Sequence, residues 1–261
     1  FRSVNEAINA AADGATVQLL SRTISEAIAP WKTDTQHTTE KSITVKGYDN
    51  FGTTLTGGLY LGYDDSQCRN HTIVVEGIAF EGKGLTVACQ KNVTIRNNTF
   101  NNITDSRAIA VIGKNIEATV KDNKIDDVQI GIELRNMVVA TMTGNEVKNT
   151  THNSVQVTAA NPDADVTITG NTFENWGKGG EGRAIRVSGG DNIDVNANKM
   201  VNDNAPESFV KITKLGETVQ TIKASHNYWN DYNPLALFET DGAADPVDYL
   251  INYYADAEMQ N

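Results

Sequence analysis

The sequence predicts an all-β protein, a single-stranded right-handed parallel β-helix closed by a short N-terminal helical cap. Two observations lead to this prediction: a six-residue phrase that recurs along the chain, and a second strand pattern that recurs between its copies. Self-similarity at a period of roughly 20 to 50 residues is typical of solenoids, whose repeats bury their apolar sides against their neighbours. Because such an array grows as one unit, we expect the 261 residues to form a single domain.

The recurring phrase reads apolar, polar, small or polar, Asn, polar, large apolar. It is clearest in Ile95–Phe100 (IRNNTF) and Ile168–Phe173 (ITGNTF). The asparagines are separated by 25, 22, 26, 27 and 29 residues and form a column: Asn98, Asn123, Asn145, Asn171, Asn198 and Asn227. Ile78 takes this position one coil earlier. Asparagine tolerates left-handed backbone and its amide can bond a stacked amide, so the column predicts a ladder at a corner.

Between these phrases the residues alternate strictly, with every second side chain apolar. In a strand, alternate residues point to one side, and a parallel strand one coil later lies about 4.8 Å away with its side chains superposed. The apolar pairs therefore predict stacked columns inside a narrow cylinder: Leu85/Val87, Ile109/Val111, Ile132/Leu134, Val155/Val157, Ile185/Val187 and Val210/Ile212.

The first residues predict a cap for the open end of the cylinder. Ser3–Ala12 (SVNEAINAAA) has a Ser N-cap and apolar residues at helical spacing, and Asp13-Gly14 ends it. We expect residues 1–40 to form the cap and first strand, 41–230 the coils, and 231–261 a closing segment. A closing segment is needed because the last coil otherwise presents an unpaired strand edge.

With its asparagine ladder and stacked apolar columns, the chain resembles the pectin lyase-like right-handed β-helix superfamily. Within it, the N-terminal phrase AINAAADGATVQLL and the closing residues Asn227–Trp229 (NYW) and Asn252–Tyr254 (NYY) are similar to β-helix domains of bacterial surface and adhesin-type proteins. The resemblance implies an extracellular, secreted or cell-surface location and further domains in a larger surface protein. It also implies polysaccharide binding along a strand face.

The net charge of the chain limits the classes of partner that it is expected to bind. The chain has 33 acidic and 22 basic residues, a net charge of −11, so its surface should repel nucleic acid. No stretch approaches the roughly 18 consecutive apolar residues of a membrane span, and no secretory leader is evident at the start. A polysaccharide or host glycan is the expected partner.

The candidate binding surface is the outward row of the second strand. It contains Thr86, Ala110, Glu133, Gln156, Arg186 and Lys211, flanked by Arg107, Arg135 and Arg183. These cations suit a carboxylated sugar. A solvated sheet face displays alternating polar residues in any case, so a purely structural row is the competing interpretation. Trp176, in the glycine-rich insertion Asn175–Gly182, either stacks a sugar beside Arg183 and Arg186 or folds back over its own loop.

The outward rows lack the acidic clusters expected of a β-helix enzyme. The resemblance implies calcium-binding aspartates or paired acids on the strand face of an enzyme, and the outward rows contain neither, so no cofactor is expected and calcium lacks a ligand cluster. Glu133 and Arg186 are the catalytic candidates. A single carboxylate among arginines should remain ionised, which favours a structural ion pair.

Cys68 and Cys89 lie 21 residues apart, nearly one coil, which brings their backbones within disulfide range. A disulfide and two stacked free thiols both fit. Neither the cysteines nor the four histidines have metal-ligand spacing.

The sequence thus favours an extracellular, non-catalytic glycan-binding or adhesive module. A lyase or glycoside hydrolase acting on acidic polysaccharide is the alternative, and a rigid structural spacer is the second alternative.

Overall fold

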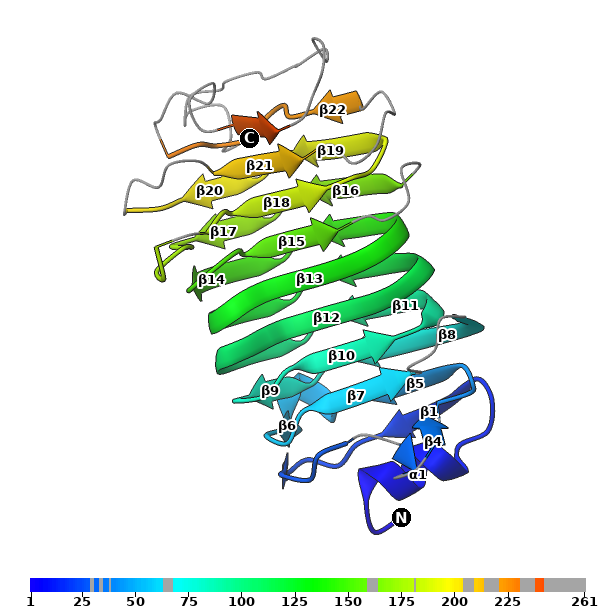
Figure 1. Ribbon diagram of the computed structural model, residues 1–261. Helices are drawn as coiled ribbons and strands as arrows, with labels where there is room; N and C mark the ends of the chain where they lie inside the picture. Colours follow the sequence, from blue (N-terminus) through cyan, green and yellow to red (C-terminus); the bar gives the residue numbers. More distant parts are fainter. Residues whose placement is uncertain are drawn as a thin grey trace.

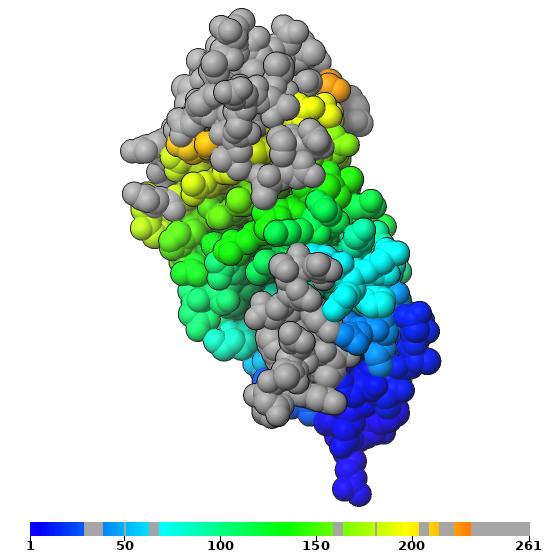
Figure 2. Space-filling view, turned by 45° about the vertical axis from the view of Figure 1, so that its right-hand side comes forward, coloured from blue at the N-terminus to red at the C-terminus, as the bar shows by residue number. Residues whose placement is uncertain are grey.

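A computed structural model shows a stack of parallel coils, about seven turns high, that rises from the N-terminal helix (Figure 1). The structure describes residues 1–28, 31–32, 35–37, 39–62, 68–158, 164–180, 182–203, 209–213, 221–230 and 238–241. Colours follow one another in bands along the long axis, because each coil contacts the coils directly before and after it (Figure 2). The predicted β-helix fold is confirmed.

Each coil contributes strands to three faces, which we call A, B and C. Face A precedes the asparagine column and contains β1 (Ala15–Gln18), β5 (Ile43–Lys46), β8 (Arg69–Glu76), β11 (Gln90–Arg96), β16 (Asp165–Thr169), β19 (Asn192–Asn196) and β22 (Thr221–Lys223). Face B follows the column and contains β2 (Thr23–Ile24), β6 (Thr54–Leu55), β9 (Ala79–Glu81), β14 (Glu146–Thr150), β17 (Thr172–Glu174) and β20 (Lys199–Val201).

Face C carries the second strand pattern. It contains β7 (Leu59–Gly62), β10 (Leu85–Ala88), β15 (Val155–Thr158), β18 (Ile185–Ser188), β21 (Val210–Thr213) and β23 (Phe238–Asp241). Two long strands, β12 (Thr99–Lys121) and β13 (Lys124–Thr143), bend through all three faces. Apart from β23, the predicted closing segment 231–261 lies outside the described residues.

The N-terminal cap forms as predicted. Helix α1 (Val4–Ala10) is capped by Ser3, whose hydroxyl accepts a hydrogen bond from the Glu6 amide, and it buries Val4 and Ile8 against the first coils. A 3-10 turn (Asp49–Phe51) follows β5. Strand β3 (Trp31–Lys32) pairs antiparallel with β4 (Thr35–His37). No helix in the described part of the chain combines the length and apolar character of a membrane span.

The core consists of stacked apolar columns in the predicted register. On face C, Leu85 lies over Leu59 and under Ile109, and the column continues to Val210. On face B, Phe80 and Phe100 stack with ring centroids 4.6 Å apart and planes within 6°. Identical positions on successive coils share one environment, so the side chains superpose and exclude water.

The asparagine ladder is present along the whole predicted column. In Asn145, for example, Nδ2 donates to the carbonyl of Val120 and to Oδ1 of Asn171, each at 2.9 Å, and Oδ1 accepts from the amide and Nδ2 of Asn123. The same pattern joins all six asparagines, and the Ile78 amide donates to Asn98 in the edge coil. Each asparagine is buried, so the ladder satisfies backbone groups that water cannot reach.

One part of the ladder prediction was wrong. The left-handed backbone belongs to the residue before each ladder asparagine, not to the asparagine itself. This preceding column contains Gly77, Asn97, Asp122, Gly144, Gly170, Ala197 and His226, with φ between 52° and 70°. The left-handed residue turns the chain, which leaves the following asparagine with ordinary backbone and its side chain directed into the corner.

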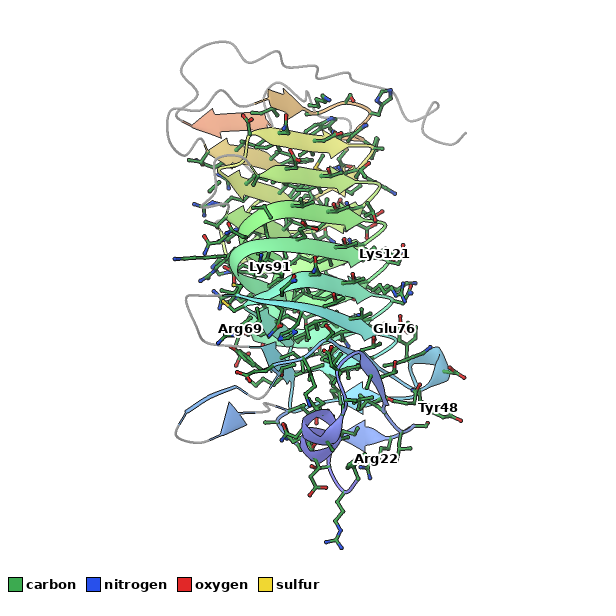
Figure 3. All side chains as sticks on the ribbon, turned by 90° about the vertical axis from the view of Figure 1, so that its right-hand side faces the viewer. Arg22, Tyr48, Arg69, Glu76, Lys91 and Lys121 are labelled. Carbon is green, nitrogen blue, oxygen red and sulfur yellow. The ribbon has the colours of Figure 1, made fainter. Side chains whose placement is uncertain are left out.

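A charged column lies outside the same corner, where face A ends. Glu76 forms one ion pair with Arg96 at 2.6 Å and a second with Lys46 at 3.4 Å. The Glu76 side chain is only 15% exposed. In Figure 3, Glu76 and Lys121 lie on one side of the stack, and Arg69 and Lys91, near the start of face A, on the other. Burial raises the pKa of Glu76, but the hydrogen bonds and charges of Arg96 and Lys46 outweigh it and hold the pKa below its usual value.

We expect Asn145→Ala to lower the free energy of unfolding by about 3 kcal/mol, because it leaves the Val120 carbonyl and the Asn123 amide groups buried without partners. Urea denaturation measures the loss. Asn101→Ala, at an exposed position of face B, is the matched control and should leave the midpoint nearly unchanged. Equal shifts for the two variants would contradict a special role for the ladder.

Glu76 should make stability depend on pH. Since its folded-state pKa lies below the ordinary glutamate value of about 4.3, its contribution is present above that pH and is lost as pH falls further. The urea midpoint of Glu76→Gln should therefore lie below that of the wild type at pH 7, and the difference should shrink as pH falls below about 4.3. Glu117→Gln, at an exposed position of face A, is the control. A gap that stays constant with pH argues against the ion-paired column.

Candidate functional site

The outward row of face C has the predicted register. Thr86, Ala110, Glu133, Gln156, Arg186 and Lys211 pair in sequence on successive strands. The row is one coil longer than predicted at its start, where Tyr60 lies beside Thr86. Between β10 and β21, Glu133 is the single carboxylate among the described strands of this face.

Glu133 is not available at the surface. Its side chain is 1% exposed and forms ion pairs with Arg107, from the preceding coil, and with Arg135, whose Nη2 lies 2.6 Å from Oε1. Ala110, the neighbour of Glu133 in the row, is too small to fill the space beside it, and the two arginine side chains cover the carboxylate instead. Each arginine side chain remains 40% exposed. The cluster thus has one buried negative and two partly exposed positive charges.

The predicted catalytic pair does not assemble. Gln156 lies between Glu133 and Arg186 in the row, so the two candidates are two coils, roughly 10 Å, apart. A proton donor or acceptor must lie within hydrogen-bond reach of the reacting atom, which a carboxylate beneath two arginines does not. Glu133 has the structural ion-pair role, with Arg107 and Arg135 as its partners.

Gln156, Arg183 and Arg186 lie together on the next two coils. The Gln156 side-chain oxygen accepts from Asn153 Nδ2 at 3.0 Å, and Asn153 Oδ1 accepts from the Arg183 amide at 2.9 Å. Asn153 therefore links Arg183, the residue that follows the insertion, to Gln156 in the row. Arg186 is exposed beside Gln156, and Lys211 follows it, half-buried. From Gln156 to Lys211 the row is therefore polar and basic, and Glu239 of β23 follows next in register.

The prediction that Trp176 displays its ring to a sugar was wrong. The indole is 1% exposed and packs edge-on against Phe209, with ring centroids 4.6 Å apart. The insertion is held against the coil below by backbone hydrogen bonds from Gly177 to His152 and from Gly179 to Thr151, which turn the indole inward. The alternative interpretation, in which the indole covers its own loop, agrees with this geometry.

A shallow groove of about 220 Å³ lies at the N-terminal end of face C. Its lining includes Tyr60, Thr86, Lys83 and Arg107, while Gly57, Gly58 and Gly84 contribute no side chain. Lys83 also forms an ion pair with Asp105 at 3.0 Å. Tyr60 and Lys83 were missed by the sequence analysis, although the alternating Leu59-Tyr60-Leu61 extends the same period by one coil.

The sulfur atoms of Cys68 and Cys89 lie 2.6 Å apart, at the corner where face A begins. Their predicted stacking one coil apart is confirmed, and Cys68 also accepts a hydrogen bond from the Lys114 amide. Among the residues that the structure describes, no group of three or more His, Cys, Asp or Glu side chains is close enough to hold a metal ion.

The three faces, the buried columns and the ladder define a right-handed parallel β-helix. A family model described as the right-handed beta helix region matches residues 44–200, more than half of the 261 residues. The chain belongs to this family, and its fold fits the pectin lyase-like superfamily, as predicted. No curated protein and no solved structure shows significant similarity to it.

Glu133→Gln should lower the free energy of unfolding by about 1 to 3 kcal/mol, because it leaves Arg107 and Arg135 close together without a counter-charge. The partial exposure of both arginines keeps the loss below that of a fully buried pair. Arg186→Ala, on the same face, should change it by less than about 0.5 kcal/mol. Urea denaturation of both variants checks this, and an unaltered midpoint for Glu133→Gln would argue against the ion-paired cluster.

Proposed function

We propose that this β-helix is an extracellular or cell-surface module that binds acidic polysaccharide along face C without cleaving it. The observation that carries the proposal is the charge of that face. On a chain of net charge −11, the part of face C between β10 and β18 has Arg107, Arg135 and Arg186 and one carboxylate, Glu133, which is buried.

The geometry of the face suits a polymer. Successive coils present their outward residues about 4.8 Å apart, so a chain lying across the strands meets a new side chain at each coil. Arginine binds carboxylates through two parallel hydrogen bonds, which suits repeated uronate groups. The groove beside Tyr60 and Arg107 lies at the N-terminal end of the same face and offers an aromatic ring.

The non-catalytic part of the proposal rests on the state of Glu133. Hydrolases of acidic sugars need two carboxyl groups facing the scissile bond, and a lyase needs an accessible base near the reacting carbon. On the described strands from β10 to β21, the one carboxylate is covered by two arginines. A binding surface needs only the exposed cations.

The test combines binding and product release. We expect polygalacturonate and alginate, cast into native gels, to retard the protein, and retardation to fall as salt is raised because exposed charges are screened. Arg186→Ala should weaken retardation roughly three- to tenfold, the equivalent of one charge-assisted contact. Arg22→Ala, an exposed arginine near the N-terminal cap, is the matched control and should bind as the wild type does.

Unsaturated or reducing sugars released by the wild type, with or without calcium, would show an enzyme and overturn the non-catalytic proposal. Equal binding by the Arg186→Ala and Arg22→Ala variants would place the ligand elsewhere. Failure to bind any acidic polymer would favour a rigid spacer.

A further inference from the structure

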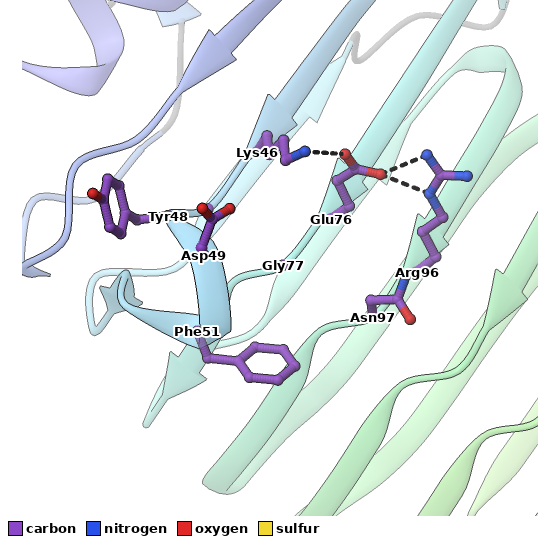
Figure 4. A pocket seen from close by; sticks show the side chains of 9 residues that line it. Lys46, Tyr48, Asp49, Phe51, Glu76, Gly77, Arg96 and Asn97 are labelled. Atoms are coloured by element: carbon purple, nitrogen blue, oxygen red, sulfur yellow. Dashed lines mark hydrogen bonds and ion pairs between the residues drawn. The ribbon is translucent and has the colours of Figure 1, made fainter.

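A second groove, on a different side of the molecule from face C, lies at the ladder corner of the early coils. Its volume is about 420 Å³, within the range of pockets that hold small ligands. One wall is the turn that carries Tyr48, Asp49 and Phe51, and the other wall is formed by Glu76, Arg96 and Asn97 (Figure 4). None of these residues belongs to the row on face C.

Two adjacent corners that line the groove carry glycine and add no side chain to it. Gly47 and Gly77 occupy the same position on successive coils, and a Cβ on Gly47 would clash with the Gly77 carbonyl. Gly77 has φ of 70°, in the left-handed region that glycine adopts freely. After Gly47 the chain swings outward into the 3-10 turn, which is fixed at its base by hydrogen bonds from the Tyr48 amide to Thr53 and from the Thr53 hydroxyl to the Leu20 carbonyl.

Ion pairs hold the polar wall of the groove in place, and the charges of the lining side chains balance. Arg96 donates to Glu76 through Nε and Nη2, at 2.7 and 2.6 Å, and Lys46 approaches Glu76 from the other side at 3.4 Å. With Asp49, the lining has two positive and two negative side chains. Such a wall has no net charge with which to attract an ion, but it presents fixed donors and acceptors. Hydroxyl groups, which both donate and accept, are suited to it.

Phe51 supplies the apolar part of the site at a cost to the fold. Its side chain is 42% exposed, and its φ is 58°. A bulky residue with positive φ is an outlier, and the other described residues with positive φ are mostly glycine, asparagine and aspartate. Asparagine or glycine would make this turn with less strain, and neither would expose an aromatic ring. Strained backbone that persists at an exposed site points to a role for the side chain.

We propose that this groove binds a neutral sugar ring of a glycan, with its C–H face on Phe51 and its hydroxyl edge on the Glu76–Arg96 pair. The face of an aromatic ring is electron-rich and favours contact with polarised C–H groups. A saccharide combines such a face with hydroxyls, which matches the two walls. Charge separates this site from the proposed site on face C, since an acidic sugar gains nothing from a wall of balanced charge.

The experiment is a saturation-transfer and titration NMR measurement with neutral pentasaccharides of glucose, mannose, xylose and N-acetylglucosamine. Because the groove is shallow, we expect a dissociation constant on the order of millimolar for at least one of them. Phe51→Asn should weaken this binding by about fivefold or more, as expected for loss of an aromatic contact. The same variant should melt no lower than the wild type, and up to a few degrees higher, because asparagine tolerates the left-handed backbone better.

Two variants serve as controls. Ala197→Asn relieves a left-handed backbone, φ 52°, at the ladder corner of a distant coil, where Asn97 already shows that asparagine fits. It should leave sugar binding unchanged. Arg186→Ala should likewise keep neutral-sugar binding, even where it loses acidic polymers, so the two proposals stand or fall separately.

Absence of binding to every neutral pentasaccharide in the panel overturns the proposal. Undiminished binding by Phe51→Asn overturns it as well. A fall in melting temperature of Phe51→Asn would show that the ring is needed for folding and would remove the argument from strain.

Discussion

The structure depends on one constraint: every coil must satisfy its backbone at a buried corner while stacking its apolar residues on the next coil. The ladder meets this constraint, since each asparagine side chain bonds the backbone and the asparagine of neighbouring coils. Bonds of this kind fix the register between coils to the residue. The apolar columns follow, because a one-residue slip would turn every core side chain outward. The left-handed residue before each asparagine lets the chain turn without distorting it.

The register in turn decides the character of the surface. Side chains at equivalent positions meet one coil apart, so charges that are remote in sequence become partners, as in Arg107 with Glu133 and Lys46 with Glu76 and Arg96. In the Glu76 cluster both cations come from neighbouring coils, whereas Glu133 pairs with one arginine from the preceding coil and one from its own strand. On face C this leaves exposed positive charge, whereas at the ladder corner Asp49 balances it. The two proposed sites differ in ligand because the same stacking rule acts on different residues.

Departures from the repeat create the concave parts of the surface. Where the coils are regular, the faces are flat. The groove at the ladder corner is lined by two stacked glycines and a turn that swings outward, and the groove on face C is lined by three glycines. An insertion does not guarantee a site, as Trp176 shows: backbone hydrogen bonds hold its loop against the coil below, and the indole joins the core.

The sequence by itself determined the fold, the ladder column, the register of the outward row and the stacking of Cys68 on Cys89, because each depends on a period that recurs in the chain. Only the tertiary structure decided which outward residues are accessible. Burial of Glu133 depends on the small neighbour Ala110 and on two arginine rotamers, and the direction of Trp176 depends on how its loop packs. No repeated pattern in the sequence predicts the groove beside Phe51. Period specifies position, whereas exposure depends on side chains from several coils at once.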